Sequence, residues 1–293
     1  MSEPDDARSS GTGRLYVVPT PLGNPADLSA RAIETLRSVD LIAAEDTRTV
    51  GALLRPLGIT TRMVSYHDHS EQQRAPALLA ELEAGARIAL VSEAGTPLVA
   101  DPGFRLLVLA IERGIPVHSL PGPSAALTAL VGSGLPASSF LFLGFLPRRG
   151  GPRTAAIRAV AGLPHTLVLF EAPHRILEAL EDLATELGAR RAALGWNLTR
   201  DNERFLRGTL AELRAEIAAW PYPHGQMTLV VEGAADGASP EVWARAERAM
   251  RLMLEQGVEP RVVRDAVAEL ADLPRREVYQ RVLALRDGFD ETD

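Results

Sequence analysis

The chain has 293 residues, of which 46% are hydrophobic and 24% are charged, and its formal net charge is −7. This length accommodates two domains of ordinary size, and the composition is that of a globular protein. Cysteine and lysine are both absent, which excludes disulfides, thiolate catalysis, Schiff-base chemistry and a P-loop lysine. No apolar run approaches the roughly 18 residues of a membrane-spanning helix, and the polar, acidic start differs from a signal peptide. We therefore expect a cytoplasmic protein with no membrane partner.

Short apolar runs alternate with amphipathic helical patterns between residues 14 and 135. Strands and helices that alternate at this spacing predict a parallel sheet with helices on both faces. This sheet and its helices would form an N-terminal α/β domain. Ligands of such sheets bind at the carboxyl ends of the strands. We expect strands at 15–19, 41–45, 62–66, 88–92 and 117–120, and helices at about 28–38, 47–57, 70–84, 103–113 and 123–133.

Residues 136–233 predict a second, mixed α/β domain, because one pair of strands is spaced like a hairpin. Its expected strands are 140–146, 166–172, 193–199, 204–209 and 226–233, and its helices 153–162, 173–188 and 209–219. The flanking segments complete the predicted organisation, with a disordered tail over 1–13, a linker over 234–240 and a helical module over 241–287. The pattern leaves open whether this module binds nucleic acid or caps the fold.

Three predicted strands end in turns rich in glycine, proline and small residues. The first strand is followed by PTPLGNP, the fourth by EAGTP and the fifth by LPGPSAA. One such turn is commonplace, but three at one sheet edge predict a pocket that binds a small molecule through backbone hydrogen bonds. The absence of G-x-G-x-x-G and of lysine argues against a dinucleotide or a triphosphate.

One basic cluster stands out in a chain that is acidic overall. It consists of Arg148, Arg149 and Arg153 in FLPRRGGPRT. The sequence leaves open whether this cluster contacts RNA or is a solvated surface.

Several segments, in this order, resemble the bacterial small-subunit ribosomal RNA cytidine 2′-O-methyltransferase family of the tetrapyrrole-methylase superfamily. They are LYVVPTPLGN, DLIAAEDTRTVGALL, SYHDH, SEAGTPLVADPGFRL, LPGPSAALTAL, SGLPASSFLFLGFLPRR, LFEAPHRILEALEDL and LRGTL, and they span about residues 14–233. The resemblance implies S-adenosylmethionine as cofactor, held between two domains. It also implies small-subunit (16S) ribosomal RNA, within the 30S particle, as substrate, and a homodimer.

The resemblance also implies roles for individual residues. The cofactor would contact Pro21, Glu93, Ala94, Gly95, Thr96, Pro97, Asp101, Pro121, Gly122, Ser124, Ala125, Phe170, Gln226 and Met227. The RNA would contact Thr20, Gly23, Asn24, Arg48 and Arg175, and the candidate bases or positioning groups are Glu45, Asp46, His67, Glu171 and His174. Glu45 and Asp46 have an alternative role as helix caps, and Asp101 as a brace of its turn. We expect no metal site, because two histidines two apart in His67–His69 are a poor ligand set.

Three departures from the family pattern put the substrate side in doubt. Glu93 and Gln226 stand where the family usually has aspartate and glutamate, and Trp196–Arg200 read WNLTR where it usually has RELTK. Two other functions stay open. The acidic charge leaves open a methyltransferase of tetrapyrroles or other small molecules, and the departures leave open a non-catalytic cofactor-binding or ribosome-assembly module.

Overall fold

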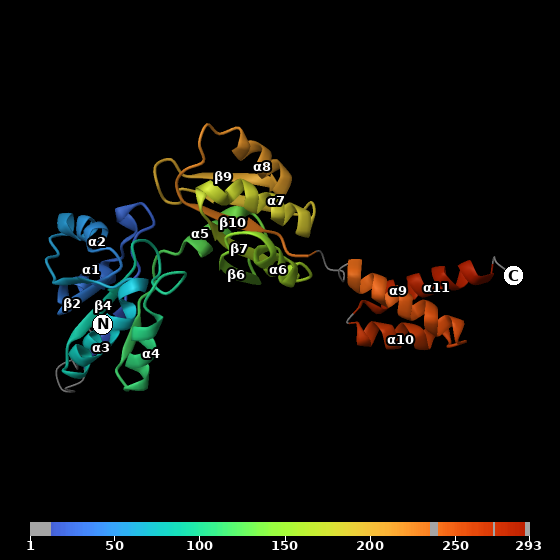
Figure 1. The fold of residues 1–293 in the computed structure, drawn as a ribbon, viewed down its shortest axis with the longest axis horizontal. Helices are drawn as coiled ribbons and strands as arrows, with labels where there is room; N and C mark the ends of the chain where they lie inside the picture. The colour runs from blue at the N-terminus through green and yellow to red at the C-terminus, as the bar shows by residue number, and fades with distance from the viewer. Residues whose placement is uncertain (1–12, 235–239, 272, 291–293) are drawn as a thin grey trace.

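The computed structural model of the chain describes residues 13–234, 240–271 and 273–290. Figure 1 shows two α/β domains next to each other and a helical module at the far end of the chain. The predicted tail over 1–13 lies outside the described residues except for Gly13. The backbone N–H of Gly13 donates to the carbonyl of Leu82, and a Cβ at Gly13 would meet backbone oxygen at 2.2 Å. The first domain therefore begins one residue earlier than predicted.

The first domain is a parallel sheet with the strand order β3-β2-β4-β1-β5. Its elements are β1 Arg14–Val17, α1 Ala30–Ser38, β2 Leu41–Ala44, α2 Thr47–Leu54, β3 Met63–Ser65, α3 Asp68–Glu83, β4 Arg87–Val91, α4 Phe104–Glu112, β5 Val117–Ser119 and α5 Ala125–Ser133. Alternate side chains of the strands enter different cores, since Leu15 and Ile88 pack with α3 and α4 whereas Ile42 and Ala89 pack with α1 and α2. The predicted parallel sheet is confirmed.

The order of these strands brings the three glycine- and proline-rich turns together. β1 pairs with β4 on one side and with β5 on the other, always in parallel. The carboxyl ends of three adjacent strands therefore meet at one edge of the sheet, and the turns that follow them are neighbours.

The second domain is a mixed sheet with the strand order β6-β7-β10-β8-β9. Only β6 and β7 are parallel, and the other neighbouring pairs are antiparallel. Its elements are β6 Phe140–Phe145, α6 Gly150–Val160, β7 Thr166–Glu171, α7 Ile176–Leu187, β8 Arg191–Trp196, β9 Arg204–Thr209, α8 Leu210–Ala218 and β10 Met227–Val231. The mixed sheet and its hairpin β8–β9 agree with the expectation from sequence.

Helix α5 connects the two domains in space as well as in sequence. Its residues Ala126 and Leu130 pack against Val168 of β7 and Val230 of β10, in a cluster that also includes Leu22 of the first domain. Although the predicted boundary at 135 assigns α5 to the first domain, its buried face covers the second sheet. The apolar composition of α5 predicts burial but does not say against which sheet.

Arg153 is buried rather than part of a basic surface. Its side chain is only 2% exposed and lies between α6 and α7, where Nε donates to Asp182 Oδ2 at 2.5 Å and a second nitrogen lies 3.1 Å from Glu178 Oε1. A third nitrogen donates to the carbonyl of Arg148 at 3.1 Å. The prediction of a cluster of three surface arginines is therefore wrong for Arg153. A buried charge of this kind is retained only where acceptors surround it, as Asp182, Glu178 and the Arg148 carbonyl do here. Arg148 and Arg149 are exposed.

The C-terminal module has a core of its own. It consists of α9 Pro240–Glu255, α10 Pro260–Leu270 and α11 Arg275–Asp290, and its fully buried side chains include Met250, Val263 and Val278. The predicted linker lies outside the described residues over 235–239, and α9 begins at its last position, Pro240. Within the described segments, no helix is long and apolar enough to span a bilayer.

Candidate active site

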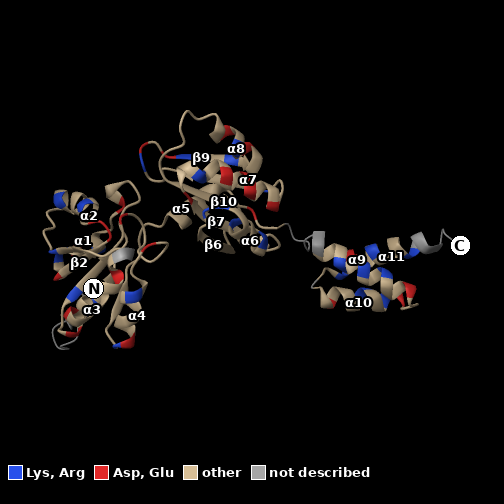
Figure 2. Ribbon diagram, in the orientation of Figure 1, with Lys and Arg blue, Asp and Glu red and all other residues tan. Residues whose placement is uncertain are grey.

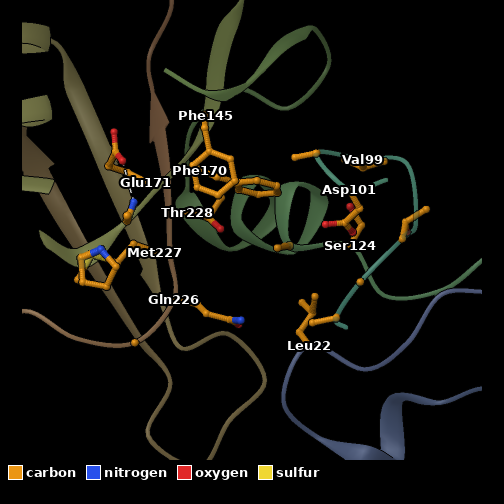
Figure 3. A pocket seen from close by; sticks show the side chains of 18 residues that line it. Leu22, Val99, Asp101, Ser124, Phe145, Phe170, Glu171, Gln226, Met227 and Thr228 are labelled. Carbon is orange, nitrogen blue, oxygen red and sulfur yellow. Dashed lines mark hydrogen bonds between the residues drawn. The ribbon is translucent and has the colours of Figure 1, made fainter. Parts of the chain in front are cut away.

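A cavity of about 300 Å³ lies between the two domains. The first domain contributes the turns after β4 and β5, and the second contributes the ends of β6 and β7 and the start of β10. Figure 3 shows Asp101 and Ser124 on one side and Phe170, Thr228 and Met227 on the other. Its lining residues are Leu22, Ala94, Gly95, Thr96, Val99, Ala100, Asp101, Ser124, Ala125, Phe145, Phe170, Glu171, Ala172, Pro173, Gly225, Gln226, Met227 and Thr228.

Gly95 places backbone rather than side chain at the cavity wall. Its φ of +83° lies in the left-handed region, and a Cβ there would lie 3.2 Å from Leu22 Cδ2. Gly95 exchanges two backbone hydrogen bonds of 2.9 Å with Thr20, so the turns after β1 and β4 are joined. These constraints are met by glycine, which adopts positive φ without steric cost.

The Thr20 side chain does not lie where a contact with the substrate was expected. It is fully buried, and its hydroxyl donates to the carbonyl of Ser92 at 3.1 Å. Thr20 therefore braces the two turns instead of reaching a ligand.

The turn after Gly95 is held in a conformation that ordinary residues seldom adopt. Leu98 and Ala100 have φ of +73° and +67°, and such strain persists where the surroundings determine the backbone, as at ligand-binding sites. The Thr96 hydroxyl donates to the carbonyl of Pro123 at 2.9 Å, which ties this turn to the one after β5. The strained segment directs Val99, Ala100 and Asp101 to the cavity.

The opposite wall is largely aromatic and apolar. The Phe170 ring makes edge-on contacts with Phe142 and Phe145, at centroid distances of 5.0 and 5.6 Å. Phe170 and Thr228 are directly paired across β7 and β10. This wall offers a surface for a flat, apolar group of a ligand.

Glu171 and Arg175 form a buried ion pair at the end of β7. Arg175 Nε donates to Glu171 Oε1 at 2.6 Å, a second guanidinium nitrogen contacts the same oxygen, and the backbone N–H of Ala172 donates to it at 2.7 Å. The Glu171 side chain is fully buried and that of Arg175 is 14% exposed. Glu171 Oε2 is buried and has no hydrogen-bond partner among the described residues. Arg175 is therefore paired with Glu171 and is largely buried, rather than a free cation for the RNA contact that was expected of it.

The ionisable side chains that line the cavity are all acidic. Asp101 and Glu171 are the two ionisable residues among the described lining residues, which include no basic side chain. Arg175 offsets the charge of Glu171 from outside the lining, so the wall offers carboxylates rather than competing cations to a positively charged ligand.

Nine of the expected cofactor residues line the cavity and five do not. Those that line it are Ala94, Gly95, Thr96, Asp101, Ser124, Ala125, Phe170, Gln226 and Met227, whereas Pro21, Glu93, Pro97, Pro121 and Gly122 lie outside it. Thr228, which the resemblance also implies near the cofactor, lines the cavity as well, whereas sequence reasoning missed Leu22, Val99, Ala100, Phe145, Ala172, Pro173 and Gly225. Phe145 and Ala172 could have been found from their place in the predicted sheet, because Phe145 ends the apolar strand β6 and Ala172 follows β7.

Of the expected catalytic residues, Glu171 alone lines the cavity. Asp46 instead caps α2, since its carboxylate accepts from the Arg48 backbone N–H at 2.7 Å and from the Arg48 guanidinium at 2.9 Å. The side-chain hydrogen bond from Arg48 and the backbone bond lower the pKa of Asp46 to about 2. The helix-cap alternative for Asp46 is thus the one that the structure supports, and Arg48 is engaged with its own helix cap.

The remaining candidates are spread around the same edge of the first sheet and the start of α7. Glu45 lies beside Glu93, whose backbone N–H is 3.5 Å from Glu45 Oε2. His67 precedes α3, and its backbone N–H donates to Ser70 Oγ at 3.0 Å. His174 is exposed, in the 3₁₀ helix Pro173–Arg175. None of the three lines the cavity.

A second hollow lies where Gly23 and Asn24 face the turn between β8 and β9. Gly23, Asn24 and Pro25 line it from the first domain, and 199–202 from the second. The backbone N–H of Asn24 donates to the Thr199 hydroxyl at 3.2 Å, which connects the domains. The expected substrate residues Gly23 and Asn24 are therefore close to the cavity but outside it. Among the described residues, no group of acidic and histidine side chains could hold a metal ion.

Comparison with known proteins decides the family. The profile of the Tetrapyrrole (Corrin/Porphyrin) Methylases matches residues 14–214. The chain belongs to this family. It is 49% identical over 276 residues to ribosomal RNA small subunit methyltransferase I of Micromonospora olivasterospora, covering 94% of this chain and 88% of that protein.

A second relative supports the same assignment. Ribosomal RNA small subunit methyltransferase I of Mesorhizobium japonicum is 41% identical over 280 residues, covering 95% of this chain and 94% of that protein. The resemblance inferred from the motifs is confirmed. Among solved structures, uroporphyrin-III C-methyltransferase of Thermus thermophilus complexed with S-adenosylhomocysteine superposes with a TM-score of 0.53 at 23% identity, covering 74% of this chain and 97% of that one. This superposition supports the fold.

Proposed function

We propose that this chain is an S-adenosylmethionine-dependent methyltransferase that modifies small-subunit ribosomal RNA, at the 2′-oxygen of a cytidine in the decoding region. The observation that carries the proposal is the cavity between the domains, with two carboxylates and no basic side chain in its wall, in a chain 49% identical to a ribosomal RNA small subunit methyltransferase I. A methyltransferase cofactor with a sulfonium and an ammonium group suits a cavity of this charge.

Two features of the cavity fit this cofactor. Glu171 Oε2 is a buried acceptor without a protein partner among the described residues, and such an atom is costly unless a ligand donates to it. Gly95 leaves room that a Cβ would fill, close to Leu22. The aromatic wall around Phe170 would receive an apolar or flat portion of the ligand.

The residues of this chain act mainly by positioning. S-adenosylmethionine supplies an electrophilic methyl group, and the attacking ribose oxygen must approach in line with the bond that breaks. Holding two reactants in that geometry removes much of the entropic barrier. The turns after β1, β4 and β5 fix one reactant, because backbone hydrogen bonds join Thr20 to Gly95 and the Thr96 hydroxyl donates to the carbonyl of Pro123. The hollow at Gly23 and Asn24 leaves an approach for the RNA.

The RNA is expected to be selected by its shape. A chain with a net charge of −7 gains little from general attraction to phosphate, and RNA is read mostly at splayed, unpaired nucleotides. We therefore propose the assembled small subunit as the preferred substrate, and the bacterial cytoplasm as the place of the reaction.

Transfer of a labelled methyl group tests this function. With tritiated S-adenosylmethionine, we expect labelling of unmodified 30S particles, weaker labelling of free 16S RNA and none of a tetrapyrrole. Mass mapping of the product should place the methyl group on one ribose, because the expected acceptor is a hydroxyl. A methyl group on a base, labelling of the tetrapyrrole alone, or cofactor binding without any transfer would contradict the proposal and favour one of its alternatives.

We also propose that the enzyme is a homodimer. The apolar side chains Phe104, Ile111, Leu127 and Val131 of α4 and α5 are all more than half exposed in the single chain, and an exposed group of this kind is typical of an interface between subunits. Light scattering at micromolar concentration should give twice the chain mass of 31.5 kDa. A Val131→Glu variant should shift the mass towards the monomer, whereas a mass of one chain for the unmodified protein would refute the dimer.

A further inference from the structure

Tyr222 is a large aromatic side chain left in solvent. It lies in the loop that joins α8 to β10, which reads WPYPHGQ over 220–226, and its side chain is 72% exposed. Pro221 and Pro223 flank it and restrict the backbone on both sides. An exposed ring on a restrained backbone is available for contact with a binding partner.

Contacts at its base hold the loop in place. Trp196 Nε1 donates to the carbonyl of His224 at 2.6 Å, and the rings of Trp220 and His224 pack on the Trp196 ring at 5.1 and 5.3 Å between centroids. His224 Nδ1 lies 2.9 Å from the carbonyl of Tyr222. Because the base is paired with the buried Trp196, the loop is restrained, which lowers the entropic cost of binding through its tip.

The same loop runs directly into the cavity wall. Gly225 and Gln226 line the cavity, and the Gln226 N–H donates to Asn197 Oδ1 at 3.0 Å. A Cβ at Gly225, where φ is +86°, would lie 2.3 Å from Asn197 Oδ1. Tyr222 is thus three residues away from a segment whose backbone is fixed at the mouth of the cofactor cavity.

An arginine accompanies the aromatic side chains. Arg204 is exposed, and its Cζ lies 6.0 Å from the centroid of the Trp196 ring. Figure 2 shows both signs of charge around the turn between β8 and β9, where Asp201 and Glu203 accompany Arg200 and Arg204. Glu203 accepts a hydrogen bond of 2.6 Å from the Thr199 backbone N–H. The surface beside Trp196, on which the base of the Tyr222 loop packs, therefore carries both signs of charge rather than a strongly basic patch.

We propose that Tyr222, on a loop held by His224 and Trp196, forms a stacking platform for an unpaired nucleobase of the RNA, next to the nucleotide that receives the methyl group. The inference rests on the proposed function. Unpaired RNA bases are bound on the faces of tyrosine and histidine rings and on guanidinium planes, without a need for net positive charge. The position of the loop beside the cavity fits a neighbour of the target nucleotide, which is splayed out together with it.

Substitution of the ring tests the platform in two measurements. The first is the affinity for a fluorescein-labelled, unstructured 12-nucleotide RNA by anisotropy, and the second is kcat/KM for methyl transfer to 30S particles. Tyr222→Ala should reduce both by about 5- to 150-fold, the range of one base stacked on an aromatic ring. Tyr222→Phe should stay within about twofold of the unmodified protein because the face of the ring is kept, and Tyr222→Leu should behave like Tyr222→Ala because the π-face is lost.

Two controls separate a stacking role from general damage. Leu252→Ala removes another exposed apolar side chain, 61% exposed on α9, and should change neither measurement. The affinity of every variant for S-adenosylhomocysteine should equal that of the unmodified protein, since Tyr222 does not line the cavity.

The two measurements also distinguish this inference from the proposed function. If the unmodified protein methylates 30S particles and Tyr222→Ala stays within twofold of it in both measurements, the platform is refuted and the function stands. If Tyr222→Ala loses RNA affinity although no transfer to 30S particles occurs, the platform stands and the function is refuted. A Tyr222→Leu variant that binds RNA as well as the unmodified protein refutes stacking in favour of simple apolar contact.

Discussion

Gly95→Val should lose most of its affinity for S-adenosylmethionine. The new Cβ would lie 3.2 Å from Leu22 Cδ2, and both residues line the cavity. Extra methyl groups in a shaped site of this size cost about 1–3 kcal/mol, which corresponds to about 5- to 150-fold in affinity. Isothermal titration calorimetry with the cofactor product, S-adenosylhomocysteine, measures the loss directly and without the RNA.

Gly58→Val is the matched control for this prediction. Gly58 also has a positive φ, of +68°, but no atom lies within 4 Å of the position of its Cβ, and it does not line the cavity. A valine at either position carries the strain of the left-handed region, about 1–2 kcal/mol. Both variants should therefore lose similar stability, whereas only Gly95→Val should lose cofactor affinity. Equal affinities of the two variants would show that the cavity is not the cofactor site.

The part of the site that comes from the first domain could be predicted from the sequence. Backbone conformation at Gly95 and the course of the turns depend on local residue types, and a parallel sheet places consecutive strand ends at one edge. The resemblance then added residues of the second domain such as Phe170 and Met227. The positive φ angles of Leu98 and Ala100 could not be predicted from the sequence, because neither residue favours a positive φ by itself.

Side-chain pairing accounts for most of what the sequence could not reveal. Asp46, Arg153 and Arg175 are charged residues next to predicted strands or helices, and each could equally face a ligand or a neighbouring side chain. The choice depends on the packing of separate elements, as for Arg153 between α6 and α7. The domain against which α5 packs could not be predicted for the same reason, since the apolar face of this helix is compatible with either sheet.

The ion pair of Glu171 and Arg175 explains how one wall of the cavity stays charged although it is buried. A lone carboxylate in that position would be strongly disfavoured, and the guanidinium beside it compensates the charge through Oε1. The second oxygen has no hydrogen-bond partner among the described residues, and we propose that it accepts from the ligand. The pair thus links the stability of the second domain to the chemistry of the cavity.

Arg175→Met should accordingly destabilise the protein by about 3–5 kcal/mol, because it leaves the Glu171 carboxylate buried without its cation. Urea denaturation followed by tryptophan fluorescence measures this, since Trp196 and Trp220 lie in the same domain. The matched control is Arg214→Met. Arg214 pairs with Glu181 at 3.1 Å, with side chains that are 44% and 61% exposed, and the loss of such a surface pair costs only about 0–1 kcal/mol.

The double variant Glu171→Gln, Arg175→Met separates the two roles of the pair. Removing both charges should restore much of the lost stability, since no unpaired charge stays buried. Cofactor affinity should fall below that of the unmodified protein in the double variant, because the neutral amide no longer attracts the positive charge of S-adenosylmethionine. An Arg175→Met variant as stable as Arg214→Met would contradict the stabilising role of the pair, and one that keeps its stability and cofactor affinity but loses RNA binding would support the RNA contact expected from the sequence.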